Sequence, residues 1–231
     1  MLLKKPCYGQ LDAPRRWFLE ACRRLRGLGL RQHVLDPCTF LIFEKDFGVS
    51  EFSPGAVGEC GLVGIICLHV DDLLGAGDGN SPTYQHVIKS LKDTFTFREW
   101  HDGESLTYCG ADIQRDANHI KLHHTKYLQK VKPVTISKGV GPAAELSSRE
   151  ISNLRGLMGS LQWPAVQSSP HLQASTSMLS GEATKGLVGT AVEANRLLKF
   201  AKENSDVGLC FSPLGPLDQL RMITAFDASF C

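Results

Sequence analysis

The longest apolar run of the chain, residues 61–68 (Gly-Leu-Val-Gly-Ile-Ile-Cys-Leu), is closely followed by two adjacent aspartates, Asp71 and Asp72. An apolar run of this length suits a buried β-strand and is too short to cross a bilayer, which takes about twenty residues. Carboxylates at the end of a buried strand are costly unless a cation or hydrogen-bond donors meet them. We therefore expect a strand, a tight hairpin turn that carries both aspartates, and a second strand.

The spacing of apolar residues predicts the remaining elements. Helical spacing predicts helices at 14–27, 82–96, 147–162, 171–180 and 190–204. Strand patterns occur at 39–43, 62–70, 72–77, 106–115, 119–123, 207–211 and 221–226. The fold class is therefore α/β in the mixed, α+β sense, with a mixed or antiparallel sheet followed by a helical region.

A linker separates the strand-rich part of the chain from the helical part. Glycines and prolines between 133 and 142 interrupt any periodicity, and Ser147 with Glu150 forms a capping box for the next helix. A length of 231 residues suits one large or two small domains. We predict a strand-rich unit at 1–132, a linker at 133–146, a helical unit at 147–206 and a further piece at 207–231.

Charge is unevenly distributed although the whole chain is nearly neutral. The formal net charge is +1, whereas residues 1–35 contain eight Lys or Arg and only two acidic residues. A polyanion such as nucleic acid would bind near this end, because the excess positive charge attracts it there. Arg15, Arg16, Arg23 and Arg24 are equally compatible with a solvated helix face.

The spacing of the eight cysteines indicates the cellular compartment in which the protein is expected. They form no Cys-x-x-Cys pair, and several lie inside apolar runs, as Cys67 does, where cysteine behaves as a small hydrophobic residue. The first residues, Met-Leu-Leu-Lys-Lys-Pro, lack the apolar segment of a signal peptide. We expect a reduced, soluble, intracellular protein with no membrane partner, in the cytoplasm, the nucleus or a virus-like particle.

The aspartate pair has more than one interpretation. An acidic hairpin turn is the simplest. A hard cation such as Mg²⁺ is the other, because it takes a few carboxylates together with phosphate oxygens. A calcium EF-hand loop that starts at Asp72 is excluded, since its twelfth residue is Thr83 and not a glutamate.

Two other candidates have plain structural interpretations. His123 and His124 lack a second ligand pair at metal spacing, so we expect solvated histidines there. Trp17 falls on the apolar side of the first predicted helix, so we expect it in the core and not as a platform on which bases stack.

Several segments, taken together and in order, resemble the reverse transcriptase of copia-type LTR retrotransposons. That family shows Tyr-Gly-Leu-x-x-Ala-Pro-Arg-x-Trp, then Asp-x-x-x-aromatic, then Tyr-Val-Asp-Asp, matched here by residues 8–17, 36–40 and 69–72. Its primer-grip strand, its Ser-Gln-x-Lys-Tyr-Ile segment and a following Gly-Ser-Leu helix are similar to residues 106–113, 123–130 and 155–163. The opening strand of the attached RNase H domain resembles residues 223–230.

The resemblance implies a fold and a reaction. Residues 1–132 would be a partial palm of the polymerase, 147–206 its thumb or connection, and 207–231 the connection and the truncated start of an RNase H-like domain. The reaction would be the template-directed addition of deoxynucleotides to a primer 3′-OH. An RNA or DNA template–primer and a dNTP would be the partners, and Mg²⁺ or Mn²⁺ the cofactor.

Site residues follow from the matching positions. Asp71 and Asp72 would be catalytic and would hold the metal. Contacts to the nucleotide and the template would come from Tyr8, Gly9, Ala13, Pro14, Arg15 and His69. The primer grip would comprise Tyr108, Cys109 and Gly110, and the metal-binding aspartate of the RNase H-like domain would be Asp227.

The chain also departs from the family. His69 replaces the tyrosine of the metal motif, and Gln10 replaces a leucine. The upstream fingers and palm segment, whose Leu-Asp-Val motif supplies the first catalytic aspartate, is expected to be a separate partner because the sequence starts after it. A two-metal site needs carboxylates from both segments. We therefore expect a reverse transcriptase fragment that is inactive alone, and the alternative is a non-catalytic retroelement remnant that at most binds nucleic acid.

Overall fold

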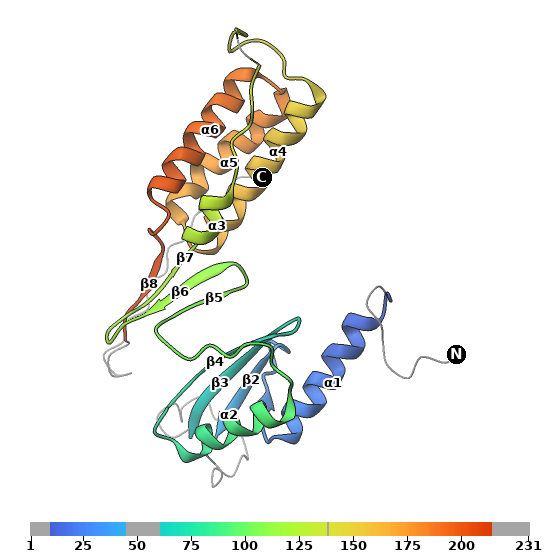
Figure 1. The fold of residues 1–231 in the computed structure, drawn as a ribbon, viewed down its shortest axis with the longest axis vertical. Helices are drawn as coiled ribbons and strands as arrows, with labels where there is room; N and C mark the ends of the chain where they lie inside the picture. The colour runs from blue at the N-terminus through green and yellow to red at the C-terminus, as the bar shows by residue number, and fades with distance from the viewer. Residues whose placement is uncertain (1–9, 45–60, 138, 214–231) are drawn as a thin grey trace, which may run out of the picture. The chain divides into compact units, whose positions relative to one another are not determined.

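The chain forms two compact units, each with its own sheet and its own core. The computed structural model describes residues 10–44, 61–137 and 139–213, and the chain divides between Trp100 and His101. Each unit contains a four-stranded antiparallel sheet, and the described residues include six α-helices (Figure 1). The predicted α+β class with an antiparallel sheet is confirmed.

The first unit is a meander of strands with helices on one face. Its elements are α1 (Ala13–Gly27), β1 (Arg31–Gln32), β2 (Thr39–Phe43), β3 (Leu62–His69), β4 (Asp72–Gly77) and α2 (Pro82–Thr94). Strands that follow one another in the chain are neighbours in the sheet, in the order β1-β2-β3-β4. Side chains of α1, α2 and one face of the sheet share a single apolar core, so both helices cover that face (Figure 1).

Local sequence determines where the two helices begin. Pro14 lies in the first turn of α1, where its missing N–H costs no helical hydrogen bond. Ser81 caps α2, because its hydroxyl oxygen accepts a hydrogen bond from the backbone N–H of Tyr84 at 3.1 Å. Both helices therefore start where the sequence predicts.

Glycines in β3 and β4 allow α2 to approach the sheet closely. A Cβ atom at Gly64 would lie 2.5 Å from Cδ2 of Tyr84, and one at Gly77 would collide with the same ring and with the carbonyl of Val63. Glycine usually weakens a strand, and a close approach is one of the reasons it is retained there. The glycines thus make room for the Tyr84 ring.

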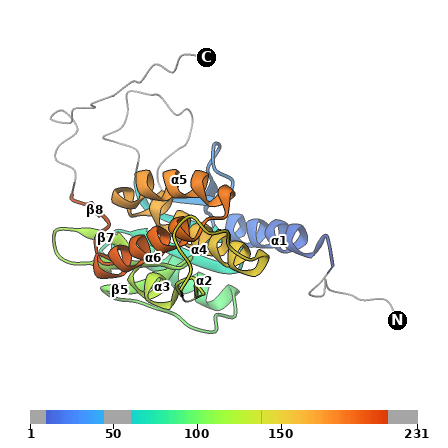
Figure 2. The ribbon, with the colours of Figure 1, turned by 90° about the horizontal axis from the view of Figure 1, so that it is seen from above.

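In the part that the structure describes, the second unit combines four strands with four α-helices. Its elements are β5 (Ser105–Tyr108), β6 (Ala111–Arg115), β7 (Ile120–His123), α3 (Thr125–Lys130), α4 (Ser148–Gln167), α5 (Gln173–Glu182), α6 (Val188–Glu203) and β8 (Leu209–Phe211), and the 3₁₀ turns η1 (Pro170–Leu172) and η2 (Ala183–Lys185) flank α5. The last strand returns to pair with β7, so the sheet order is β5-β6-β7-β8. Helices α4, α5 and α6 pack against one another around a core rich in leucine and alanine (Figure 2).

Hydrogen bonds fix both the start of α4 and the extended segment before it. The predicted capping box is present: Glu150 N–H donates to Ser147 Oγ at 3.4 Å, and Ser147 N–H donates to Glu150 Oε2 at 2.9 Å. The Ser147 hydroxyl also donates to Glu150 Oε2 at 2.6 Å, and the bonds from this hydroxyl and from the Ser147 N–H lower the pKa of Glu150 to about 2. Asn195 of α6 exchanges two hydrogen bonds of 2.8 Å with the backbone of Val134, so the segment before α4 is tied to the helices.

Two predicted elements differ from the structure, and one element of the structure is not predicted. The strand predicted at 106–115 is two strands, because a turn at Cys109 and Gly110 interrupts it. The short helix α3 follows β7, where no helix is predicted. Helix α4 continues past the predicted end at 162 and contains Pro164. The strand predicted at 221–226 lies outside the described residues.

Candidate functional site

Asp71 and Asp72 lie at the hairpin turn between β3 and β4. The strand register pairs His69 with Asp72, so Val70 and Asp71 are the two central residues of the turn. Both aspartates are exposed. The predicted hairpin is confirmed, and it presents two adjacent carboxylates of the kind that a hard cation takes as ligands.

The backbone of this turn is unusual. Val70 has a φ of +53°, whereas φ of Asp71 is negative. A positive φ at the first central residue alone is the pattern of a type II′ turn, in which glycine is the usual residue. A β-branched residue in this region is an outlier that costs on the order of 1–3 kcal/mol. Other contacts must therefore hold the turn in place.

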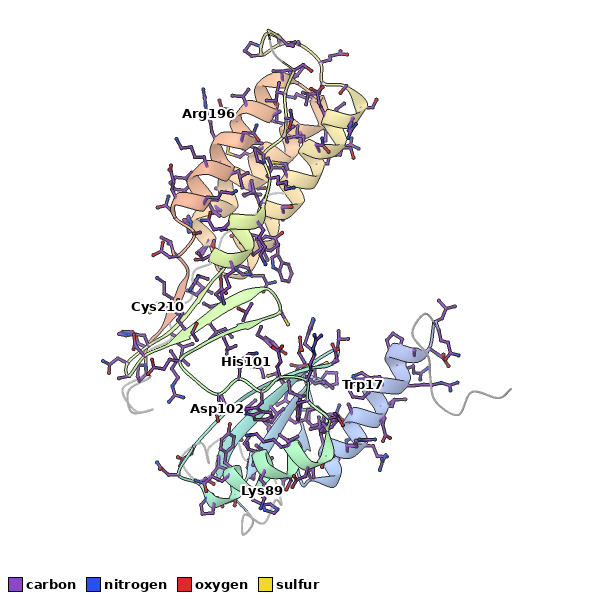
Figure 3. All side chains as sticks on the ribbon, viewed as in Figure 1. Trp17, Lys89, His101, Asp102, Arg196 and Cys210 are labelled. Atoms are coloured by element: carbon purple, nitrogen blue, oxygen red, sulfur yellow. The ribbon has the colours of Figure 1, made fainter. Side chains whose placement is uncertain are left out.

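Trp17 of α1 makes such a contact. Its indole N–H donates a hydrogen bond of 2.6 Å to the carbonyl oxygen of Val70, so the side chain reaches from α1 to the end of the β3–β4 hairpin (Figure 3). The ring also packs edge-on against Phe95, with 6.4 Å between the ring centroids. Trp17 remains exposed, so the prediction that it lies in the core is wrong. The ring of Trp17 thus packs against Phe95, while its indole N–H binds the backbone of the turn.

The aspartates adjoin the face of the sheet that is opposite the helices. Ile66 points toward α1 and α2 and is buried, whereas its neighbours Ile65 and Cys67 lie on the other face and are at least partly exposed. Alternation along β3 places His69 on this second face, and cross-strand pairing places Asp72 there too. Partly exposed apolar residues thus lie next to the carboxylates.

Glu20 engages two of the arginines that the sequence groups into a basic face on α1. Its carboxylate accepts a hydrogen bond from Arg23 Nε at 2.8 Å and another from Arg24 Nε at 2.8 Å. These bonds lower the pKa of Glu20 to about 2. Arg24 also donates from Nη1 to the carbonyl oxygen of Thr94 at 3.1 Å, which joins α1 to the end of α2. Both arginines therefore have partners within the protein.

The first turn of α1 is more accessible to an external anion. Ala13 and Pro14 form that turn, and Arg16 pairs with Asp12 at 2.7 Å. Arg15 is exposed and makes no ion pair within the described residues. Arg15 is thus the arginine of this group that is best placed to contact a phosphate.

Tyr108, Cys109 and Gly110 form the end of a second hairpin. Tyr108 pairs with Ala111, so Cys109 and Gly110 are the turn, with φ of +50° and +81°. Two positive φ values are the pattern of a type I′ turn. A Cβ atom at Gly110 would lie 3.9 Å from Nε1 of Trp163 in α4. These residues belong to the second unit, whereas Asp71 and Asp72 belong to the first.

A buried carboxylate, Asp112, lies in the same sheet. Burial by itself would raise its pKa, but hydrogen bonds from Lys126 N–H at 2.9 Å and from the Thr107 hydroxyl at 3.1 Å hold the pKa below its usual value. The Lys126 ammonium lies 3.3 Å from the same carboxylate. Asp112 is therefore neutralised within the protein and joins β5, β6 and α3.

His123 and His124 are both buried, so the prediction of solvated histidines is wrong. Burial lowers the pKa of both imidazoles. His124 Nδ1 lies 2.6 Å from Ser168 Oγ, and the ring meets Trp163 edge-on at 6.3 Å between centroids. The two histidines are enclosed because α3 starts directly after β7, a helix that the sequence pattern does not reveal.

The remaining candidates concern metal binding and the ends of the chain. No group of three or more His, Cys, Asp or Glu side chains in the described ranges is arranged to hold a metal ion. Asp71 and Asp72 present two carboxylates from one turn. Tyr8, Gly9 and Asp227 lie outside the described residues.

None of the helices in the part of the chain that the structure describes is long and apolar enough to span a membrane.

Sequence comparison links the chain to a mobile genetic element. The chain is 27% identical over 178 residues to the retrovirus-related Pol polyprotein from transposon RE1 of Arabidopsis thaliana. The match covers 71% of this chain and 11% of that polyprotein, so the chain spans about a tenth of its length. No family model and no solved structure matches the chain. The similarity supports, in general terms, a region of a retrotransposon-derived Pol polyprotein.

Proposed function

We propose that the chain is part of a copia-type reverse transcriptase, in which Asp71 and Asp72 bind Mg²⁺ or Mn²⁺ during addition of deoxynucleotides to a primer 3′-OH. The observation that supports this most is the β3–β4 hairpin, which presents adjacent, exposed carboxylates at the end of a sheet that helices cover on one face. The order of the motifs along the chain and the similarity to a Pol polyprotein provide further support.

The carboxylates of Asp71 and Asp72 are suited to form one part of a magnesium site. Mg²⁺ prefers oxygen ligands and keeps several waters, so two exposed carboxylates can occupy one side of its coordination shell. When bound, the ion would neutralise charge on the transferred phosphoryl group and orient the triphosphate. A two-metal site requires a third carboxylate, which the resemblance assigns to the Leu-Asp-Val segment upstream of the matched residues.

The other candidate residues take supporting roles in this proposal. Ala13, Pro14 and Arg15, with Tyr8 and Gly9, would line the nucleotide and template side, and His69 would lie beside the metal ligands. Residues Tyr108 to Gly110 would support the primer end. The first unit would be part of the palm, α4 to α6 would be the thumb, and 207–231 would lead into an RNase H-like domain that contains Asp227.

Primer extension tests the proposal. The 231-residue chain is assayed on a homopolymer template with Mg²⁺ or Mn²⁺, alone and with an added upstream segment of a copia-type reverse transcriptase that contains Leu-Asp-Val. We expect no extension by the chain alone, because two carboxylates hold the ion weakly and the resemblance assigns further nucleotide-positioning residues to the upstream segment. Extension with the added segment, abolished by Asp71→Asn with Asp72→Asn, would support the proposal. Equal extension by the double variant would overturn it.

The alternative is a retroelement remnant that binds nucleic acid without catalysis. The excess of positive charge in residues 1–35 is compatible with such binding. This alternative predicts nucleic-acid binding that weakens steeply with salt, and no extension in any combination of segments.

A further inference from the structure

We infer that Trp17 is a positioning residue for Asp71: its indole N–H holds the peptide group that leads directly into this aspartate. The inference rests on the proposed function, in which Asp71 and Asp72 hold the metal. The hydrogen bond links two residues that are 53 positions apart in the chain and joins α1 to the hairpin turn. Trp17 would thus act on the metal site through the backbone of Val70.

The hydrogen bond acts on the group that decides the type of turn. In a two-residue hairpin, types I′ and II′ differ chiefly by a flip of the central peptide, which here joins Val70 to Asp71. The carbonyl oxygen of Val70 belongs to that peptide, so a donor at 2.6 Å selects one of its two orientations. The flipped orientation would require a positive φ at Asp71, whereas the observed φ is negative. Loss of the donor would therefore let the Asp71 side chain leave the turn in a different direction.

The turn needs an external contact because its own residues do not favour it. Val70 is β-branched and has a φ of +53°, a conformation that glycine adopts without strain. Val70 is 66% exposed as a residue, so packing around it contributes little. The indole N–H of Trp17 thus stabilises a conformation that glycine would provide in an ordinary hairpin of this type.

Trp17 is itself held in a defined place. Its ring packs edge-on against Phe95, directly after the end of α2. Helix α1 buries Ala21 and Leu25 in the core of the first unit, and Arg24 ties it to the last carbonyl of α2. The donor is therefore attached to a helix that is fixed by packing and by hydrogen bonding.

Hydrogen exchange of the tryptophan side chains tests the contact in the full chain. Trp17, Trp100 and Trp163 are 37%, 37% and 41% exposed, so exposure alone predicts similar exchange of their indole N–H groups. In nitrogen-15 spectra, with the Trp17 signal assigned from Trp17→Phe, we expect this N–H to exchange about tenfold more slowly than the other two. Equal rates for all three would overturn the inference.

Binding of Mn²⁺ tests the positioning role without any need for activity. Trp17→Phe removes the donor and keeps an aromatic ring against Phe95, and Trp100→Phe is the matched control from the same unit. By electron paramagnetic resonance, we expect Trp17→Phe to weaken Mn²⁺ binding about tenfold, as loss of a group that orients a metal ligand does. Trp100→Phe should leave the affinity unchanged, and both variants should keep the far-ultraviolet circular dichroism spectrum of the unmodified chain, which shows that the fold is retained.

The double variant Asp71→Asn with Asp72→Asn shows whether a negative result contradicts the proposed metal site or only the positioning role of Trp17. If this variant binds Mn²⁺ as the unmodified chain does, the proposed metal site is wrong. If it loses Mn²⁺ while Trp17→Phe does not, the metal site stands and the positioning role of Trp17 is wrong. Loss of Mn²⁺ in both, with Trp100→Phe unaffected, supports the inference.

Discussion

The ring of Tyr84 occupies the space that a side chain at Gly64 would need, since a methyl carbon there would lie 2.5 Å from Tyr84 Cδ2 and 3.1 Å from Ile42 Cδ1. Helix α2 therefore meets β3 at a point where the sheet has no side chain. This contact sets the distance between the helix and the sheet that carries the aspartate hairpin.

We predict that Gly64→Ala lowers the free energy of unfolding by about 1–3 kcal/mol, because an added methyl group overpacks this contact. Gly79→Ala is the control, since a Cβ atom at Gly79 would have nothing within 4 Å. Urea unfolding measures both. In a Tyr84→Ala background, Gly64→Ala should cost less, and strictly additive costs would contradict the contact.

Replacing Val70 by glycine should stabilise the first unit. Glycine adopts a φ of +53° without strain, so Val70→Gly should raise the free energy of unfolding by about 0.5–1 kcal/mol. Val63→Gly, in the regular part of β3, should have the opposite effect because a strand residue loses its side chain. Thermal unfolding checks both variants, and a lower melting temperature for Val70→Gly would show that the valine is not strained.

The elements that carry the aspartates are predictable because each is a short, largely apolar run. Residues 62–70 and 72–77 contain apolar residues on both sides of a short polar turn, which suffices to predict the hairpin. The role of Trp17 is different. Helical periodicity indicates the side of α1 on which Trp17 lies, but no local pattern reveals that its N–H meets a carbonyl 53 positions away.

Two features of the second unit differ in how far the sequence indicates them. The dipeptide Cys109-Gly110 is a turn signal, since a glycine in the middle of a strand pattern often marks a break. The burial of His123 and His124 could not be predicted from spacing, because it depends on α3 and on Ser168 at the end of α4. Tertiary packing decides their environment.

Arg15 should contribute more to nucleic-acid binding than Arg23 does. Both substitutions to alanine remove one positive charge, but Arg23 already donates to Glu20 at 2.7 Å, whereas Arg15 has no ion pair within the described ranges. Arg15→Ala should weaken binding of a single-stranded oligonucleotide and lower the salt slope of log K by about one unit. Fluorescence anisotropy at several salt concentrations gives both slopes. Equal slopes for the two variants would argue against a phosphate contact by Arg15.

The second unit should lose stability in mild acid through its buried histidines. Burial lowers the pKa of His124 from the ordinary value of 6.5, so the unfolded chain takes up a proton at a pH where the folded chain does not. Above pH 6.5 the imidazole is neutral in both states, and its burial costs no proton-linked stability. As the pH falls from 6.5 toward the lower folded-state pKa, the unfolded state gains protons and the free energy of unfolding decreases. The same direction holds for His123.

The fluorescence of Trp163, whose ring meets that of His124, can follow this unfolding. We expect a lower melting temperature at about pH 5 than at about pH 7.5, and a smaller difference in His124→Gln. His119→Gln changes an exposed histidine and should leave the difference intact. Identical pH profiles for His124→Gln and the unmodified chain would contradict the prediction.

The pairing of β8 with β7 has a consequence for the order of folding. Leu209 pairs with Leu122, and all of α3 to α6 lies between the two strands in the chain. Closing so long a loop costs entropy that a three-residue strand cannot recover by itself. We therefore expect the helices to assemble first and return the chain to the sheet, so that β8 is the last strand to add during folding. Because β8 is the edge strand of the described sheet and is held by few bonds, we also expect it to detach first when the native protein opens.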